Sequence, residues 1–178
     1  LGSAVRVLYP NVQNQNSTQG GLCQVLDTRY VEFTGALTRF DDGTTGEPAG
    51  LPVAYYVGTS ELVNPASGSY NPNAFTCDGT TGWTTTRPAD LSTVKAVRAT
   101  YSMTAARWQR TLVLQVTQQL LPSAEVGQDV WSWGSYINPS SATNAWANPS
   151  RSTSPADAGP SATLTPDARY PYAVGGRD

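Results

Sequence analysis

Few residues of this chain can carry chemistry, because it contains no histidine and a single lysine, Lys95. Histidine is the commonest general base and metal ligand near neutral pH. Its absence excludes a Ser-His-Asp triad, a Cys-His pair, a His-ligated zinc site and an HExxH helix. The composition therefore favours a protein that binds or packs, and we expect no enzymatic activity.

Carboxylates are the remaining candidates, since a glycosidase needs only a pair of them. The four glutamates are Glu32, Glu47, Glu61 and Glu125. Only Glu32 lies in a strand-like run, where alternation can aim its side chain into a cleft. The other three are expected to be solvated loop charges. We therefore predict no catalytic, metal-binding or cofactor-binding residues.

The only dense aromatic cluster is formed by Trp131, Trp133 and Tyr136, with Trp146 nearby. Residues 131 and 133 point to the same face of a strand, so an exposed pair could stack on sugar rings. Tryptophan is, however, mostly buried and is enriched at subunit contacts. The pattern favours a core or an interface, and these four residues are the predicted self-association interface.

The bulk composition indicates one nearly neutral domain over residues 1–178, a length that supports a proper core. Charged residues make up only 13 %, the net charge is −2, and the arginines are scattered. No global field therefore pulls the chain toward nucleic acid or an anionic membrane. No stretch approaches the roughly 20 apolar residues that cross a bilayer. Because the sequence starts at Leu1, we expect a processed or partial chain.

Two cysteines, Cys23 and Cys77, leave two interpretations open. They can pair, which would fit an oxidising compartment, or they can be free buried residues, as is common in cytosolic chains.

Hydrophobic residues alternate with a period of mostly two, and turn residues recur at short intervals, which is typical of strands. The predicted strands are residues 4–9, 22–26, 30–40, 51–57, 92–103, 110–121 and 129–137. The first two are expected to form a hairpin-like unit with a long polar tip, and residues 92–103 and 110–121 a second strand pair. A single helical turn is predicted at residues 90–92.

The connections are long and polar, and residues 138–168 form a predicted extended loop rich in proline, serine and alanine. Seven or so short strands joined in this way predict an all-β fold, an antiparallel β-sandwich with little helix.

Two segments carry a family resemblance. The opening L-G-S-A-V-R-V-L-Y-P-N-V-Q-N-Q-N-S-T-Q-G-G-L-C-Q-V-L-D resembles a recurring pair of strands in the shell domain of small icosahedral viruses. The segment G-W-T-T-T-R-P-A-D, residues 82–90, is similar to a Trp…Arg-Pro segment that precedes a later shell strand. The tail R-Y-P-Y-A-V-G-G-R-D could lead into a closing strand that this chain lacks.

This resemblance implies a jelly-roll capsid protein, found in the virion, whose partners are copies of itself and neighbouring capsid subunits. Such proteins usually carry a basic arm for the packaged genome, and none is present here. Genome contact is therefore expected only through a segment outside this chain.

Two alternatives remain. Residues 88–103 followed by 110–117 look like the terminal strand pair of minor type IV pilins, which implies an extracellular fibre subunit, although residues 1–20 contain no long pilin helix. A carbohydrate-binding module or glycosidase would instead use Trp131, Trp133 and Glu32.

Overall fold

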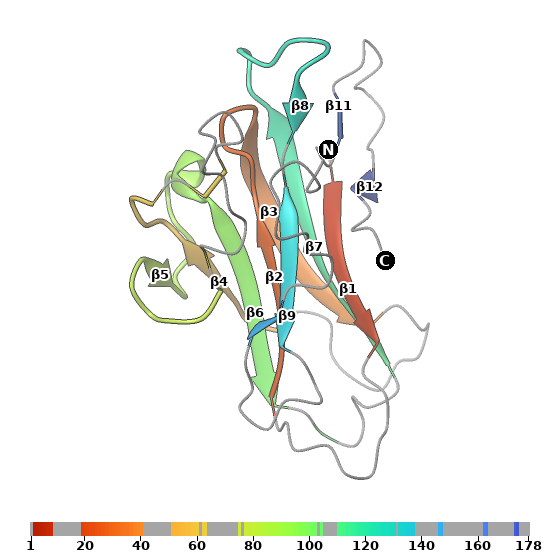
Figure 1. The fold of residues 1–178 in the computed structure, drawn as a ribbon. Coiled ribbons are helices and arrows are strands. Elements are labelled where there is room, and N and C mark those ends of the chain that lie inside the picture. The colour runs from red at the N-terminus through yellow and green to blue at the C-terminus, as the bar shows by residue number, and fades with distance from the viewer. Residues whose placement is uncertain are drawn as a thin grey trace.

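The computed structural model describes residues 2–8, 19–40, 51–60, 62–63, 75, 77–102, 104, 110–130, 132–137, 146–147, 162–163 and 173–174. This part of the chain is nearly all β, as the periodicity predicts (Figure 1). The strands are β1 (Gly2–Leu8), β2 (Gln19–Val25), β3 (Val31–Phe40), β4 (Val53–Tyr56), β5 (Trp83–Thr84), β6 (Ala96–Ser102), β7 (Thr111–Leu120), β8 (Asp129–Val130), β9 (Trp133–Ile137), β10 (Trp146–Ala147), β11 (Ala162–Thr163) and β12 (Ala173–Val174).

The single helical turn is η2 (Leu91–Thr93), which confirms the turn predicted there. Its N-cap is Asp90, whose carboxylate accepts hydrogen bonds from the backbone N–H and the hydroxyl of Ser92. A short acidic side chain at this position satisfies a donor that has no partner within the turn. No helix of the described residues is long and apolar enough to cross a membrane.

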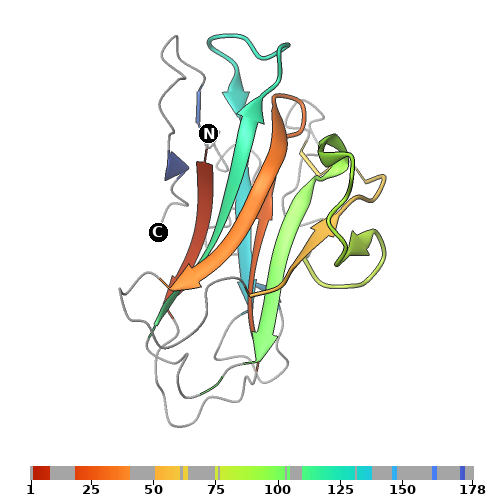
Figure 2. The same cartoon turned by 180° about the vertical axis from the view of Figure 1, so that it is seen from behind.

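Two larger sheets lie against each other, and Figure 2 shows them from behind. Sheet A has the order β12-β1-β7-β3, and sheet B has the order β10-β9-β2-β6-β4-β5; β8 and β11 form a separate short ladder. All pairings are antiparallel except that between β1 and β12.

From β1 to β7 the strand pairs are nested within one another: strands near the start of this series pair with strands near its end. β1 pairs with β7, β2 with β6, and β4 with β5. β7 then also pairs with β3, and β6 with β4, which completes the two sheets. Between β5 and β6 the described chain forms no strand, and η2 lies there near β3.

The two predicted strand pairs, residues 4–9 with 22–26 and residues 92–103 with 110–121, are both wrong, and for the same reason. β1 and β2 belong to different sheets, and so do β6 and β7. Each connection therefore crosses from one sheet to the other, and the long-range partner supplies the hydrogen bonds. The predicted strand 129–137 is also two strands, because β8 pairs with β11 while β9 joins sheet B.

The main core lies between the sheets and is built mostly from inward-pointing residues of β2, β3, β4, β6, β7 and β9. Its largest fully buried side chains include Phe33, Leu22, Leu112 and Leu114. The ring of Phe33 meets that of Tyr55 edge to face, with centroids 5.7 Å apart, and so joins sheet A to sheet B. Fully burying such a side chain stabilises the fold by about 1.5–3 kcal/mol.

The corner between β2 and β3 is closed by Asp27, whose side chain is completely buried. Its two carboxylate oxygens accept hydrogen bonds from Nε and Nη2 of Arg29, at 2.8 and 2.7 Å. The Asp27 carbonyl accepts from the N–H groups of Tyr30 and Val31. This corner thereby fixes where β3 begins.

Candidate interaction surface

The predicted aromatic interface is divided between different layers of the fold. Trp133 and Tyr136 lie three residues apart on β9, so they point to opposite faces of sheet B. Tyr136 packs on the main core, and Trp133 packs on the other side, on the outer face of sheet B. Trp131 lies outside the described residues. These residues therefore do not gather on one exposed surface.

Trp146 is half-buried on β10, next to Ile137 of β9. Both side chains lie close to the backbone of Gly21. A Cβ added at Gly21 would meet Cδ1 of Ile137 at 2.6 Å and a ring carbon of Trp146 at 2.9 Å. The glycine is needed here because the two side chains occupy the space above it. Trp146 thus acts in packing within this subunit.

The outer face of sheet B is covered by described residues that follow β4, namely 57–60, 62–63, 75 and 77–84, the last two of which form the edge strand β5; we call them the cover segment. Its described residues Leu62, Val63, Phe75 and Trp83 form a second hydrophobic cluster. They pack on apolar side chains of sheet B, namely Val25, Tyr56, Ala96 and Trp133.

Aromatic contacts dominate this second cluster. The ring of Phe75 lies 5.0 Å from that of Tyr56 and 6.0 Å from that of Trp133, both edge to face. Trp83 contacts Tyr56 and Phe75, at 5.4 and 6.3 Å. Pairs in these geometries contribute about 0.5–1.5 kcal/mol each beyond the area they bury. The cluster accounts for Trp133 as a packing residue.

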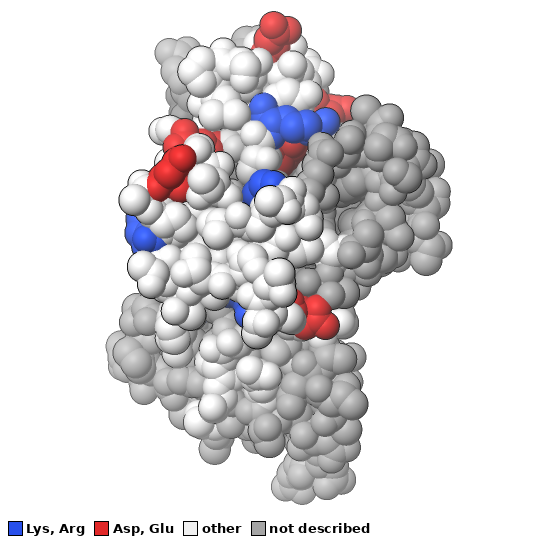
Figure 3. All heavy atoms as spheres, turned by 90° about the vertical axis from the view of Figure 1, so that its left-hand side faces the viewer, with Lys and Arg blue, Asp and Glu red and all other residues white. Residues whose placement is uncertain are grey.

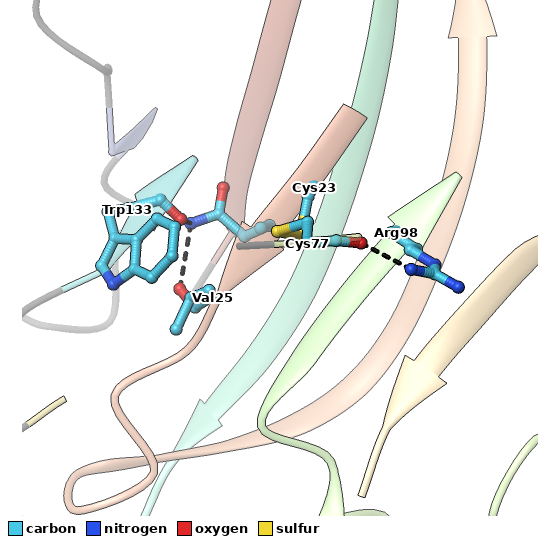
Figure 4. The surroundings of a disulfide bond; sticks show 6 residues. Cys23, Val25, Cys77, Arg98 and Trp133 are labelled. Carbon is cyan, nitrogen blue, oxygen red and sulfur yellow. Dashed lines mark hydrogen bonds between the residues drawn. A yellow bond between two sulfur atoms is a disulfide. The ribbon is translucent and has the colours of Figure 1, made fainter. Parts of the chain in front are cut away.

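A disulfide bond fastens the cover segment to sheet B. Cys23 of β2 bonds to Cys77, 54 residues away, and both are fully buried (Figure 4). The sequence left the pairing open, and the structure shows it. Beside the bond, the guanidinium group of Arg98 donates a hydrogen bond to the carbonyl oxygen of Cys77.

Arg98 also lies over the indole ring of Trp83, with Cζ 4.2 Å from the centroid. Burial in this layer lowers the pKa of Arg98, and the negative charge of Asp78 acts in the opposite direction. Arginine titrates so far above neutrality that the group stays cationic. It therefore acts as a permanent cation between the disulfide and an aromatic ring.

Two of the described carboxylates are held by specific partners. Glu32 lies on the outer face of sheet A, where its Oε2 accepts a hydrogen bond from Nε2 of Gln119 at 3.0 Å. Asp27 is held in its ion pair with Arg29. Among the residues that the structure describes, no three Asp, Glu or Cys side chains group into a metal site. Glu47 and Glu61 lie outside these residues.

The outer face of sheet A differs from that of sheet B because part of it is exposed. On β3 the outward side chains are Glu32, Leu37 and Arg39, with Gly35 between them, as their register with β7 shows. The side chain of Leu37 is 44 % exposed, so it presents apolar surface on this face.

The described surface carries few charges. Figure 3 shows the side of the molecule that bears β4 and β5, where uncharged residues form most of the described surface and charged side chains lie in small separate groups. Such a surface can be buried against another protein without removing many charges from water, which is energetically expensive. It is suited to contact with a neutral partner.

Leu37 is a candidate interaction residue that the sequence pattern did not single out. The alternation over residues 30–40 is irregular because the register with β7 shifts between Phe33 and Gly35. A β-bulge at this point shifts the alternation of inward and outward positions. The irregular alternation was therefore a sign of the bulge, but it did not show which residues of this strand face outward.

Comparison with known proteins identified no relative. No family model matches the chain, and no curated protein or solved structure is significantly similar to it.

Proposed function

We propose that this chain is a structural subunit that acts by self-association, as a coat protein of an icosahedral shell. The observation that supports this most is the nested strand order. A jelly roll is an eight-stranded double sheet made of two Greek keys. Its sheets have the strand orders B-I-D-G and C-H-E-F when the strands are lettered along the chain.

Seven strands of this chain correspond to that pattern. β1, β7 and β3 match B, I and D, and β2, β6, β4 and β5 match C, H, E and F. Every pairing required among these seven is present and antiparallel. The position of strand G is taken by η2, beside β3. The order therefore agrees with the fold expected from the resemblance to viral shell domains.

The chemistry of the surface also supports a role in assembly. The chain has 13 % charged residues and no histidine, and among the described residues no three Asp, Glu or Cys side chains group together. Since folds do not specify functions by themselves, the argument rests on the neutral surface together with the strand order. The proposed partners are copies of the chain and neighbouring shell subunits, with the virion as the location.

The disulfide favours a second candidate, an extracellular fibre subunit. Disulfides persist in oxidising compartments and are rare in the cytosol, where many shells assemble. A subunit with Cys23 and Cys77 joined would be stable outside the cell. The carbohydrate-binding alternative has less support, because Trp133 packs against Phe75 and does not present a free flat ring.

Light scattering after size-exclusion chromatography, followed by negative-stain microscopy, tests the proposal directly. Concentration-dependent growth into closed particles is the result we expect. Open filaments would favour the fibre subunit instead. A monomer at every concentration, with the disulfide intact by mass spectrometry, would contradict both candidates.

A further inference from the structure

Among the described residues, only half of the β3 edge of sheet A has a neighbour on the side away from β7. Near its start, Nη2 of Arg87 donates a hydrogen bond to the carbonyl oxygen of Thr34 at 2.9 Å, and η2 lies close by. Beyond this point, residues 35–40 continue the strand, and no described strand pairs with them on the side away from β7. This open half lies on the side of β3 where strand G of a jelly roll would pair.

An edge strand directs the N–H and C=O groups of alternate residues away from its partner, ready to pair with another strand. Natural edges are usually blocked by charged side chains (lysine above all), by proline, by a bulge or by a covering helix or loop. In β3 the bulge and Arg87 both act in the first half. The second half contains no proline and no lysine, its one charged residue is Arg39, and it exposes Leu37.

We propose that the occupant of this edge is a second copy of the chain, which adds its own β3 antiparallel to residues 35–40 about a two-fold axis. The inference rests on the proposed self-association and names the surface that carries it. Two-fold symmetry about Leu37 places this residue opposite the same residue of the second copy. Each leucine would then cover the other.

The charges of β3 are complementary in this register. Arg39 lies opposite Gly35 of the second copy, which has no side chain to obstruct it. The next outward residue beyond Gly35 is Glu32, because the bulge inserts one extra residue between Phe33 and Gly35. Diagonal neighbours on adjacent strands are within reach of long side chains. Arg39 of each copy therefore meets Glu32 of the other, while the two arginines do not face each other.

The inward-pointing side chains of the two copies are also compatible in this register. Ala36 would lie opposite Thr38 of the second copy, and both residues point to the inner face of their sheet. The hydroxyl of Thr38 donates a hydrogen bond to the carbonyl oxygen of Leu51 at 3.1 Å, just before β4. Because this bond uses the side chain, it leaves the backbone of β3 extended. The pairing thus extends sheet A from one copy into the next.

Cross-linking through Leu37→Cys tests this register. Directly opposite residues of an antiparallel pair have Cβ atoms about 4.5–5.5 Å apart, close to disulfide reach. Mild oxidation should join two copies through the introduced thiols, as seen on non-reducing gels and by peptide mapping. Thr117→Cys is the matched control, since Thr117 is exposed on the same face but one strand away from the edge.

Leu37→Arg should weaken association about tenfold or more by size-exclusion chromatography, because it sets like charges against each other. Glu32→Arg should weaken association, and Glu32→Arg combined with Arg39→Glu should restore it. Cross-linking of a discrete dimer that never forms particles would support this interface and contradict the coat function. Particles that form while Leu37→Cys cross-links no more than Thr117→Cys would overturn the interface and leave the coat function standing. A strict monomer would overturn both.

Discussion

The guanidinium group of Arg98 lies 4.2 Å above the indole ring of Trp83 and also binds the carbonyl of Cys77, so one side chain of sheet B holds the cover segment at two points. A planar guanidinium is suited to both contacts, since it can stack on a ring while donating in its own plane. Together with the disulfide, it fixes the second hydrophobic cluster on the outer face of the sheet.

We expect Arg98→Lys to lower the free energy of unfolding by about 1–2 kcal/mol, because an ammonium group cannot stack and donate in the same geometry. Urea unfolding under non-reducing conditions measures this change. Arg87→Lys is the control, since Arg87 also donates to a backbone carbonyl and lies near a ring, but it is exposed to water and its Cζ is 5.9 Å from the ring of Phe33. Its effect should stay within about 0.5 kcal/mol. Equal effects of the two substitutions would contradict a special role for Arg98.

Removing the disulfide by Cys23→Ser with Cys77→Ser should lower the free energy of unfolding by about 2–4 kcal/mol, because the bond closes a long loop in the unfolded chain. The same shift should follow reduction of the native chain. Emission of the tryptophans should move to longer wavelength as the cover segment separates from Trp133. Unchanged unfolding curves with and without reductant would show that the bond does not stabilise the fold.

The ion pair at the corner before β3 is predicted to stabilise the fold strongly. Arg29→Gln leaves the carboxylate of Asp27 in a fully buried position without its two charge-assisted bonds. The arginine side chain is 31 % exposed, so water offsets part of the loss, and we expect about 2–3 kcal/mol. Adding Asp27→Asn should recover part of the loss in a double-mutant cycle. Strict additivity would mean that the two side chains do not interact.

Gly21→Ala should destabilise the chain by about 1–3 kcal/mol through overpacking against Ile137 and Trp146. Ile137→Ala removes Cδ1 and Cγ1, the two atoms nearest to the added methyl group, at 2.6 and 2.7 Å. In that background Gly21→Ala should therefore be tolerated better, which thermal unfolding of the four variants measures. An equal loss of stability in both backgrounds would show that the strain does not come from contact with Ile137.

Much of the local structure could be predicted from residue patterns alone. The runs at 110–121 and 30–40 contain β7 and β3 almost to the residue, because β-branched side chains with a period of two are suited to a pleated surface. Asp90 likewise indicated the turn of η2, because an N-cap residue acts on the turn that directly follows it. The period of two also separates Trp133 from Tyr136, three residues apart, although their nearness in sequence suggested one cluster.

The sequence by itself determined that this chain is an all-β protein with hardly any ionisable groups, since strand alternation and composition are local properties of the residues. Only the tertiary structure decided that β1 pairs with β7 and β2 with β6, that Cys23 bonds to Cys77, and that Leu37 remains exposed beside an edge that no described strand covers. The physical reason is that strand partners are selected by burial between two sheets. Burial of this kind joins residues far apart in the chain, so it leaves no signal in any short run of sequence.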